Sequence, residues 1–191
     1  MEMIFEDLAS STRIIEDTWL YHKPVGLICT RNDPRGRPTI WRDLSHLPPP
    51  FQAVGRLDKD SCGLLLITRN GELAQHLLNP CDGVEKIYEV KAMGMWSKHK
   101  EELLRSGVEM ARGGQGRADT LRAQECGTVV DLSLALRHGK KREIRYSLAA
   151  LGLQVLALQR VKCAGLWLGD LPVGQSRPLS PQEEELLWSN P

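Results

Sequence analysis

The sequence lacks a long hydrophobic run. No stretch of about 18 consecutive apolar residues occurs in the chain, and a helix that crosses a membrane requires roughly that length. The first residues, Met1-Glu2-Met3-Ile4-Phe5-Glu6-Asp7, are acidic. They also lack the basic segment followed by an apolar segment that is typical of a signal peptide. The sequence therefore predicts a cytoplasmic protein with no membrane partner.

Cysteine is scarce and scattered. The chain has five cysteines, an odd number, and none of them stands in a Cys-x-x-Cys pair. That arrangement is typical of neither a disulfide framework nor a zinc site. The five histidines also lack the spacing of metal ligands. We therefore expect reduced, buried thiols and no metal ion.

Net charge is almost absent, at +1, and aromatic residues are few, at 5%, although 41% of the residues are hydrophobic and can form an adequate core. The basic residues nevertheless gather in the middle of the chain, at Arg31, Arg35 and Arg37 and at Arg137, Lys140, Lys141, Arg142 and Arg145. Such segregation can produce a positive face on a neutral protein. For any one cluster, an ordinary solvated surface is the commoner explanation.

Several common catalytic motifs are absent. No glycine-rich loop carries the Lys-Ser/Thr of a phosphate-binding loop, and no Gly-x-Ser-x-Gly is present. Asp58 and Asp60 form a pair of carboxylates two residues apart. A glycosidase needs two carboxyl groups on opposite sides of the scissile bond, about 5–9 Å apart. Neighbours on one turn rarely meet that requirement, so the pair does not favour a glycosidase.

Periodicity and turn signals predict a mixture of helices and strands. Strands are expected at residues 18–22, 25–29, 64–68, 85–92, 118–125, 129–136, 153–162 and 165–168. Helices are expected at 71–78 with Asn70 as cap, 97–105, 141–151, and from a Ser180–Glu183 capping box onward. Because there is no regular β-α-β alternation, we predict an α+β fold with a mixed, largely antiparallel sheet and flanking helices.

The stretch 54–71 is the centre of the chain's organisation. Asp58 lies between two cations, Arg56 and Lys59, and precedes the wholly apolar run 64–67. This pattern indicates a carboxylate on a tight turn that a buried strand holds in place, as a reactive side chain requires. A surface ion pair on an ordinary loop is an equally good interpretation of the spacing alone.

Five segments, taken in order, resemble a known set of motifs. They are Lys23-Pro24-x-Gly26, Gly55-Arg56-Leu57-Asp58 with Asp60-Ser61-x-Gly63-Leu64-Leu65, Lys86-x-Tyr88, Gly139-x-x-Arg142-x-Ile144-Arg145, and Leu168-Gly169-Asp170-Leu171 with Arg177-Pro178-Leu179. Together they resemble the RsuA-like family of RNA pseudouridine synthases over residues 20–187. The resemblance implies a lead-in segment at 1–17 and a catalytic domain at 18–191, with two lobes around a central cleft.

The same resemblance implies an isomerase that converts a uridine in RNA to pseudouridine without a cofactor or metal. The C1′–N1 bond is broken, and the uracil turns and is rejoined through C5. Asp58 would be the catalytic carboxylate, either attacking C1′ or assisting elimination across C1′–C2′. Arg145 would be its cationic partner. Tyr88 would stack on the target base, although without the family a half-buried strand tyrosine is the simpler interpretation.

RNA contacts are also implied by the resemblance. Arg56 would occupy the space that the flipped uridine leaves, and Lys23, Lys140, Lys141 and Arg142 would bind RNA, with Arg31, Arg35 and Arg37 as further phosphate contacts. Each of these residues also has an ordinary surface explanation. An Arg56 salt bridge to Asp58 or Asp60 is one of them.

Two departures from the family bear on the substrate. The chain has no room before Tyr21 for the N-terminal S4 domain of many members, so it resembles the short ribosomal large-subunit form, and Tyr146 and Ser147 replace an arginine and a methionine. We expect a monomer that acts on ribosomal RNA, with transfer RNA as a second possibility. An inactive RNA-binding or ribosome-assembly module and a base-excising nucleosidase stay open as alternatives.

Overall fold

The computed structural model describes residues 17–189, so the predicted lead-in segment lies outside the described residues except for Asp17. The strands are β1 (Thr18–Lys23), β2 (Gln52–Ala53), β3 (Cys62–Thr68), β4 (Lys86–Met93), β5 (Val108–Glu109), β6 (Gln115–Gly116), β7 (Asp119–Cys126), β8 (Val129–Leu136), β9 (Gln154–Cys163), β10 (Leu166–Trp167) and β11 (Ser176–Pro178). The α-helices are α1 (Gly71–Leu78), α2 (Lys98–Ser106), α3 (Glu143–Ala150) and α4 (Pro181–Trp188), and 3-10 turns lie at Ile40–Arg42 and Pro80–Asp82.

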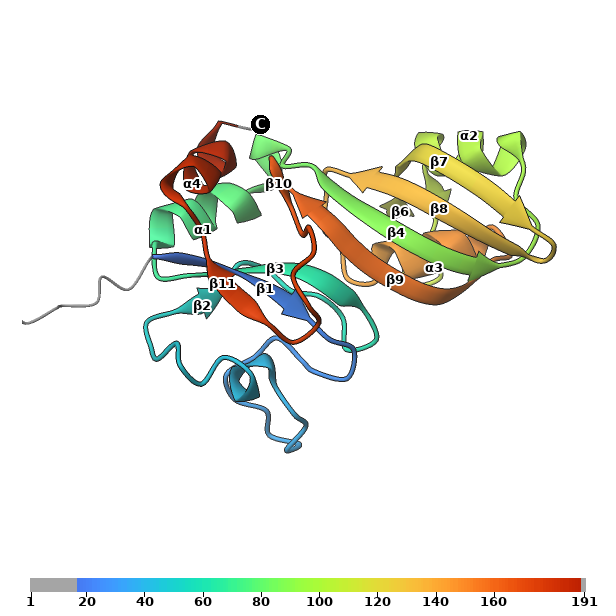
Figure 1. Ribbon diagram of the computed structural model, residues 1–191. Helices are drawn as coiled ribbons and strands as arrows, with labels where there is room; N and C mark the ends of the chain where they lie inside the picture. Colours follow the sequence, from blue (N-terminus) through green and yellow to red (C-terminus); the bar gives the residue numbers. More distant parts are fainter. Residues whose placement is uncertain (1–16, 190–191) are drawn as a thin grey trace, which may run out of the picture.

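Most strands form one mixed sheet, in the order β11-β1-β3-β9-β4-β8-β7 (Figure 1). Only the β3–β9 pair of this sheet is parallel; the other strand pairs are antiparallel. We call β11, β1, β2 and β3 the first half of the sheet, and β9, β4, β8 and β7 the second half. The predicted α+β fold with a mixed, largely antiparallel sheet is confirmed.

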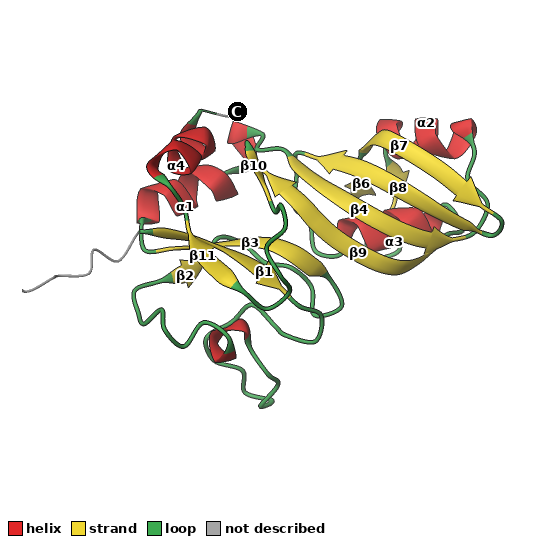
Figure 2. Ribbon diagram, viewed as in Figure 1, coloured by secondary structure: helices red, strands yellow, loops and turns green. Residues whose placement is uncertain are grey.

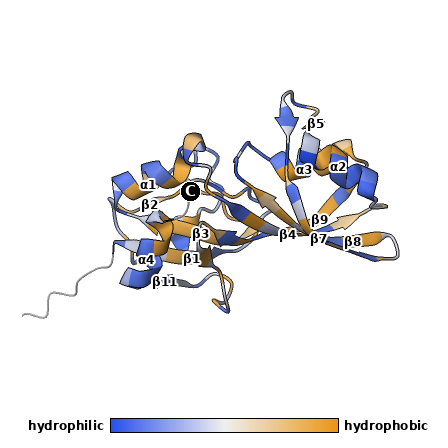
Figure 3. Cartoon of the chain, turned by 90° about the horizontal axis from the view of Figure 1, so that it is seen from above, coloured by the Kyte–Doolittle hydropathy of each residue, from blue (hydrophilic) through white to orange (hydrophobic). Residues whose placement is uncertain are grey.

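Each half of the sheet has its own helices and core. In the second half, α2 and α3 cover the same face, as Figure 3 shows, and apolar side chains of β4 and β8 pack beneath them. In the first half, Leu64 and Leu66 of β3 face the core next to α1 and α4, whereas Leu65 and Ile67 face a separate core. Since both faces of β3 are covered, its sequence is a continuous apolar run rather than an alternating one.

The second core of the first half is closed by a long connection. Residues 24–51 are loop apart from a 3-10 turn at Ile40–Arg42 (Figure 2). Ile40, Leu44, Leu47 and Phe51 of this connection are all buried against β3. The connection is therefore a packed layer of the first half and not a solvent-exposed loop.

The two halves meet where β3 runs beside β9. Only two residue pairs form this parallel contact, Cys62 with Gln159 and Gly63 with Arg160. Gly63 has a φ of +111°, and a Cβ there would lie 2.2 Å from the carbonyl oxygen of Arg160. The buried guanidinium of Arg160 donates from Nε to the carbonyl of Leu64 at 2.8 Å. The joint thus depends on a residue without a side chain and on one buried cation.

Most predicted elements are confirmed within two residues, including the Asn70 cap of α1 and the Ser180–Glu183 capping box of α4. The predicted strand at 25–29 is wrong: Ile28 makes only a single bridge to Thr39. Gly26, with φ of +92°, bends the chain two residues after Pro24. Strands β2, β5, β6 and β11 were not predicted.

Within residues 17–189, no helix is long and apolar enough to cross a membrane. The same part of the chain holds no group of three or more His, Cys, Asp or Glu side chains arranged to hold a metal ion.

Candidate active site

Asp58 lies on a tight turn between β2 and β3. The N–H of Ser61 donates to the carbonyl of Asp58 at 3.1 Å, and the N–H of Gly26 donates to the carbonyl of Lys59 at 2.7 Å. Leu57, the preceding residue, is buried in the core of the first half. The Asp58 side chain itself is 26% exposed. The turn therefore presents this carboxylate to solvent from a rigid base.

Lys23 holds the same turn from inside the protein. Its side chain is fully buried, and Nζ donates to the carbonyls of Pro24 at 2.8 Å, Asp58 at 3.1 Å and Ser61 at 2.9 Å. Three acceptors use all three N–H donors of an ammonium group. The prediction that Lys23 contacts a phosphate is therefore wrong, because the group has neither exposed surface nor a free donor. Burial also lowers the pKa of Lys23.

Two arginines from the start of α3 converge on Asp60, at the end of the turn. Arg142 forms a two-pronged contact with the Asp60 carboxylate, with both N–O distances at 2.9 Å. Arg145 donates from Nη2 to the Asp60 carbonyl at 2.6 Å, and its Nε lies 3.4 Å from the Asp60 carboxylate. The hydrogen bond from Arg142 is the main reason that the pKa of Asp60 is lowered.

The pairing of Arg145 differs from the prediction. The resemblance predicts that Arg145 is the direct partner of Asp58, but in the structure its hydrogen bonds and its ion pair are with Asp60, Ser61 and Val155. The cation within 4.0 Å of the Asp58 carboxylate is instead Nη1 of Arg142. Arg142, predicted to bind RNA, is therefore already engaged at the turn. Arg145 is mostly buried, and its Nε makes no hydrogen bond within the described residues.

A strained backbone and a buried acid hold the two arginines in place. Arg142 has φ of +56°, in the left-handed region that few side chains adopt, at the N-terminus of α3. The next residue, Glu143, is buried and accepts from the backbone N–H groups of Lys140 at 3.0 Å and Arg117 at 3.3 Å. This carboxylate ties the loop before α3 to the segment after β6, so the start of the helix is fixed relative to the turn.

Tyr88 lies on β4, beside the joint between the halves. It pairs with Arg160 of β9 across the sheet, and that guanidinium hydrogen-bonds to its hydroxyl. The ring packs against the cores of both halves. Burial raises the pKa of Tyr88, so the phenol is neutral at ordinary pH. Tyr88, Arg160 and the Asp58 turn thus lie on adjoining strands.

The remaining predicted RNA contacts are exposed. Arg56, Lys140 and Lys141 all reach the surface, and Lys140 also donates to the carbonyl of Gln115 at 2.5 Å. Their contact with RNA stays a prediction. Of the arginines in the long connection, Arg37 is paired with Asp33 at 2.6 Å, whereas Arg31 lies over the ring of Trp41.

Sequence reasoning missed three features of this site. Asp60 was considered only as half of a carboxylate pair, Lys23 only as a surface cation, and Arg160 not at all. Arg142 and Asp60 are 82 positions apart, and no local pattern signals a contact over that separation. For Lys23, the adjacent Pro24 and the buried strand before it were a signal that the side chain could be internal.

Comparison with known proteins identifies the family. The model of the RNA pseudouridylate synthase family matches residues 17–150, which is more than half of the chain. Ribosomal large subunit pseudouridine synthase B of Salmonella typhi is 38% identical over 159 residues, which cover 83% of this chain and 53% of that protein. The protein of the same name from Pasteurella multocida (strain Pm70) is 35% identical over 166 residues, covering 86% and 47%. The chain therefore spans about half the length of these curated relatives.

Solved structures show the same fold. A crystal structure of a pseudouridylate synthase superposes with a TM-score of 0.77 at 26% identity, covering 91% of this chain and 75% of that one. Human RNA pseudouridylate synthase domain containing 1 superposes with a TM-score of 0.56 at 16% identity, covering 92% of both chains, and shares the fold. With the motifs, the family match and these relatives in agreement, the chain belongs to the RNA pseudouridylate synthase family.

Proposed function

We propose that this chain converts a uridine in ribosomal RNA to pseudouridine, with Asp58 as the catalytic carboxylate. The single observation that supports this most directly is the Asp58 turn itself. The Asp58 carboxylate is partly exposed on a base fixed by Lys23, and Arg142 and Arg145 lie beside the turn. A rigid acid next to preformed cations can stay ionised when a substrate displaces water from it.

The reaction is an isomerisation, so the substrate and the product contain the same atoms. In one route the Asp58 carboxylate attacks C1′, and the C1′–N1 bond breaks with its electron pair on uracil. After the uracil turns, C5 attacks C1′ and expels the carboxylate; C5 then loses its proton and N1 gains one. In the other route Asp58 removes a proton from C2′ as the C1′–N1 bond breaks with its electron pair on uracil. C5 of the turned uracil then adds to C1′ as C2′ takes its proton back from Asp58, and C5 loses its proton while N1 gains one. Both routes require an ionised carboxylate, and uracil is a tolerable anionic leaving group.

The neighbouring side chains have distinct parts in this chemistry. Arg145 is the cation we assign to the electrostatic support of Asp58, because its guanidinium lies beside the turn and its Nε, 3.4 Å from the Asp60 carboxylate, makes no hydrogen bond within the described residues. Tyr88 offers a fixed aromatic ring to the base. Its hydroxyl is neutral, so it can accept the C5 proton only in a relay that delivers the hydroxyl's own proton to water or to N1 of the uracil. Arg56 is exposed on the approach to Asp58, where a flipped nucleotide would leave space in the RNA stack.

The biological setting is also part of the proposal. We assign ribosomal RNA, rather than transfer RNA, because the relatives are named as synthases of the ribosomal large subunit. The catalytic unit would be residues 18–191, with its two halves on either side of the substrate. We propose that it acts in the cytoplasm and as a monomer.

The test replaces the carboxylate without changing its size. We expect Asp58→Asn to lower the rate of pseudouridine formation by at least about 1,000-fold, because the reaction would lose its only nucleophile or base. The substrate is ribosomal RNA from cells that lack the gene, and pseudouridine is mapped by carbodiimide treatment and sequencing. RNA affinity should stay within about twofold of the wild type. Glu102→Gln, which removes an exposed carboxylate of α2 outside the family motifs, is the control.

Three results would contradict the proposal. The first is an unchanged rate in Asp58→Asn. The second is RNA binding by the wild type with no uridine that depends on the gene, as an inactive binding module would give. Release of free uracil, detected by chromatography, would indicate a nucleosidase.

A further inference from the structure

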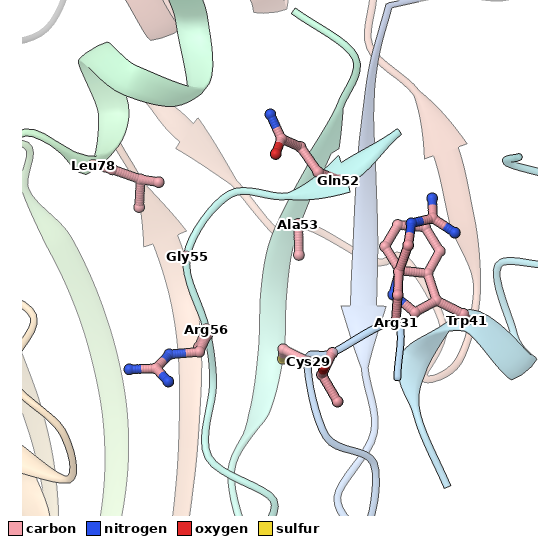
Figure 4. Close-up of a pocket in the computed structure, with 9 residues that line it drawn as sticks. Cys29, Arg31, Trp41, Gln52, Ala53, Gly55, Arg56 and Leu78 are labelled. Carbon is pink, nitrogen blue, oxygen red and sulfur yellow. The ribbon is translucent and has the colours of Figure 1, made fainter. Parts of the chain in front are cut away.

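A cavity of about 430 Å³ lies beside the catalytic turn, in the first half. Figure 4 shows Arg31 and Trp41 on one side, Arg56 and Leu78 on the other, and Ala53 between them. Arg56 is two residues before Asp58, and two residues of extended chain span at most about 7 Å. The cavity therefore opens close to the carboxylate, but none of the catalytic residues lines it.

The wall formed by Arg31 and Trp41 is a flat, charged platform. The Arg31 guanidinium carbon lies 3.5 Å from the centre of the Trp41 ring. The guanidinium also donates to the carbonyl of Phe51, which fixes its orientation. One face of the guanidinium is thus occupied by the indole. Proteins that bind unpaired RNA stack bases on aromatic rings and on arginine planes of this kind.

The other walls suit a nucleobase rather than a phosphate alone. Ala53 and Leu78 are apolar, Gly55 has no side chain, and the Gln52 amide offers an NH₂ donor group and a carbonyl acceptor to a base edge. A volume of 430 Å³ falls in the range of sites for small organic ligands. Arg31 and Arg56 on opposite sides supply positive charge for the sugar-phosphate backbone.

We propose that this cavity binds a second, unpaired base of the RNA, next in the chain to the uridine that enters the catalytic site. The site would hold the RNA beside the flipped uridine and read one neighbouring nucleotide. It thereby supplies recognition from the catalytic domain itself. This inference rests on the proposed function for the identity of the RNA, but base binding at the cavity can be measured without catalysis.

The experiment follows the indole N–H signal of Trp41 by nuclear magnetic resonance in protein labelled with ¹⁵N-tryptophan. The signal is assigned with Trp41→Phe, and the probes are adenosine 5′-monophosphate and ribose 5-phosphate. We expect the nucleotide to shift the signal saturably and the sugar phosphate to leave it in place. Arg31→Ala and Arg31→Lys should each weaken nucleotide binding at least about fivefold, because both remove the stacking plane. Thermal unfolding of both variants checks the fold.

Arg112→Ala is the matched control, because Arg112 is an exposed arginine that also lies over an aromatic ring, that of Tyr146, but is outside the cavity. It should bind the nucleotide like the wild type. An unmoved Trp41 signal, equal shifts with ribose 5-phosphate, or equal weakening by Arg31→Ala and Arg112→Ala would overturn the proposal.

The failure of this inference can be told from that of the proposed function. Asp58→Asn should abolish pseudouridine formation and leave the Trp41 titration unchanged. If the wild type forms pseudouridine but the titration fails, only the second base site is wrong. If the titration succeeds but no uridine is modified, the base site stands and the proposed function is wrong.

Discussion

At the scale of single residues, Asp60 determines how close the positive charge of Arg142 comes to Asp58. The carboxylate of Asp60 holds the guanidinium of Arg142 at 2.9 Å, so that Arg142 reaches only to 4.0 Å from Asp58. Asp58 therefore lies near positive charge without being locked into a close ion pair. A carboxylate in a two-pronged contact with arginine would have its lone pairs occupied. This arrangement leaves the Asp58 oxygens available to a substrate.

Lys23 provides the first residue-scale prediction. Replacing it by methionine keeps the apolar stem but leaves three carbonyl groups without their donor. We expect Lys23→Met to lower the free energy of unfolding by about 3 kcal/mol, because buried acceptors lose their partners. Urea unfolding measures the change, and Lys59→Met, on the exposed side of the same turn, is the control. A loss no larger than that of Lys59→Met would show that the buried ammonium does not hold the turn.

At the scale of elements, helix α4 is fixed at its start by Glu183. This side chain accepts from the backbone N–H of Ser180 and forms a two-pronged ion pair with Arg177 of β11, at 2.6 and 2.8 Å. The Arg177 hydrogen bond is the main cause that lowers the pKa of Glu183 to about 2. The helix is thereby tied to the edge strand of the first half.

This contact predicts a pH dependence of stability. The pKa of Glu183 is lower in the folded state than in the unfolded state, so its contribution is complete above about pH 4.5 and is lost as the pH falls towards 2. We expect Glu183→Gln to cost about 1 kcal/mol at pH 7 and progressively less below pH 4.5. Urea unfolding at pH 7, 4 and 3 measures this difference. Glu184→Gln, at the next position of the same helix turn, should show no such convergence.

Elements with local signals were predictable, and those formed by distant pairing were not. Helix α1 followed from the Asn70 cap and the spacing of Leu73 and Leu77 alone. Strand β11 has three residues without a pattern, and it exists because it pairs with β1 more than 150 positions earlier. The site shows the same division. The motifs supply Asp58 and Tyr88 as candidates, whereas the ion pair between Arg142 and Asp60 depends on how α3 docks on the turn.

At the scale of the whole molecule, the joint between β3 and β9 places the Asp58 turn beside Tyr88 and Arg160. Gly63 starts the apolar part of β3 five residues after Asp58, and it faces the backbone of Arg160. On the far side of β9, Arg160 is paired with Tyr88. Any change in the spacing of β3 and β9 therefore moves the carboxylate relative to the aromatic ring. The geometry of the site therefore depends on the close approach of the β3 and β9 backbones.

Gly63→Ala tests this dependence. A Cβ at this position would lie 2.2 Å from the Arg160 carbonyl oxygen, which no rotamer can relieve, so the strands must separate. Gly83→Ala is the matched control, because Gly83 also has a positive φ, +59°, but has no atom within 4 Å of its Cβ position. The control should cost about 1 kcal/mol from backbone strain alone. We expect Gly63→Ala to cost at least about 2 kcal/mol more and to lower the rate of pseudouridine formation at least about tenfold. Urea unfolding and rates on ribosomal RNA measure the two effects.

Equal losses of stability and activity in the two variants would contradict this prediction. They would mean that the halves of the sheet can separate slightly without disturbing the site, and the joint would then have no part in positioning Asp58.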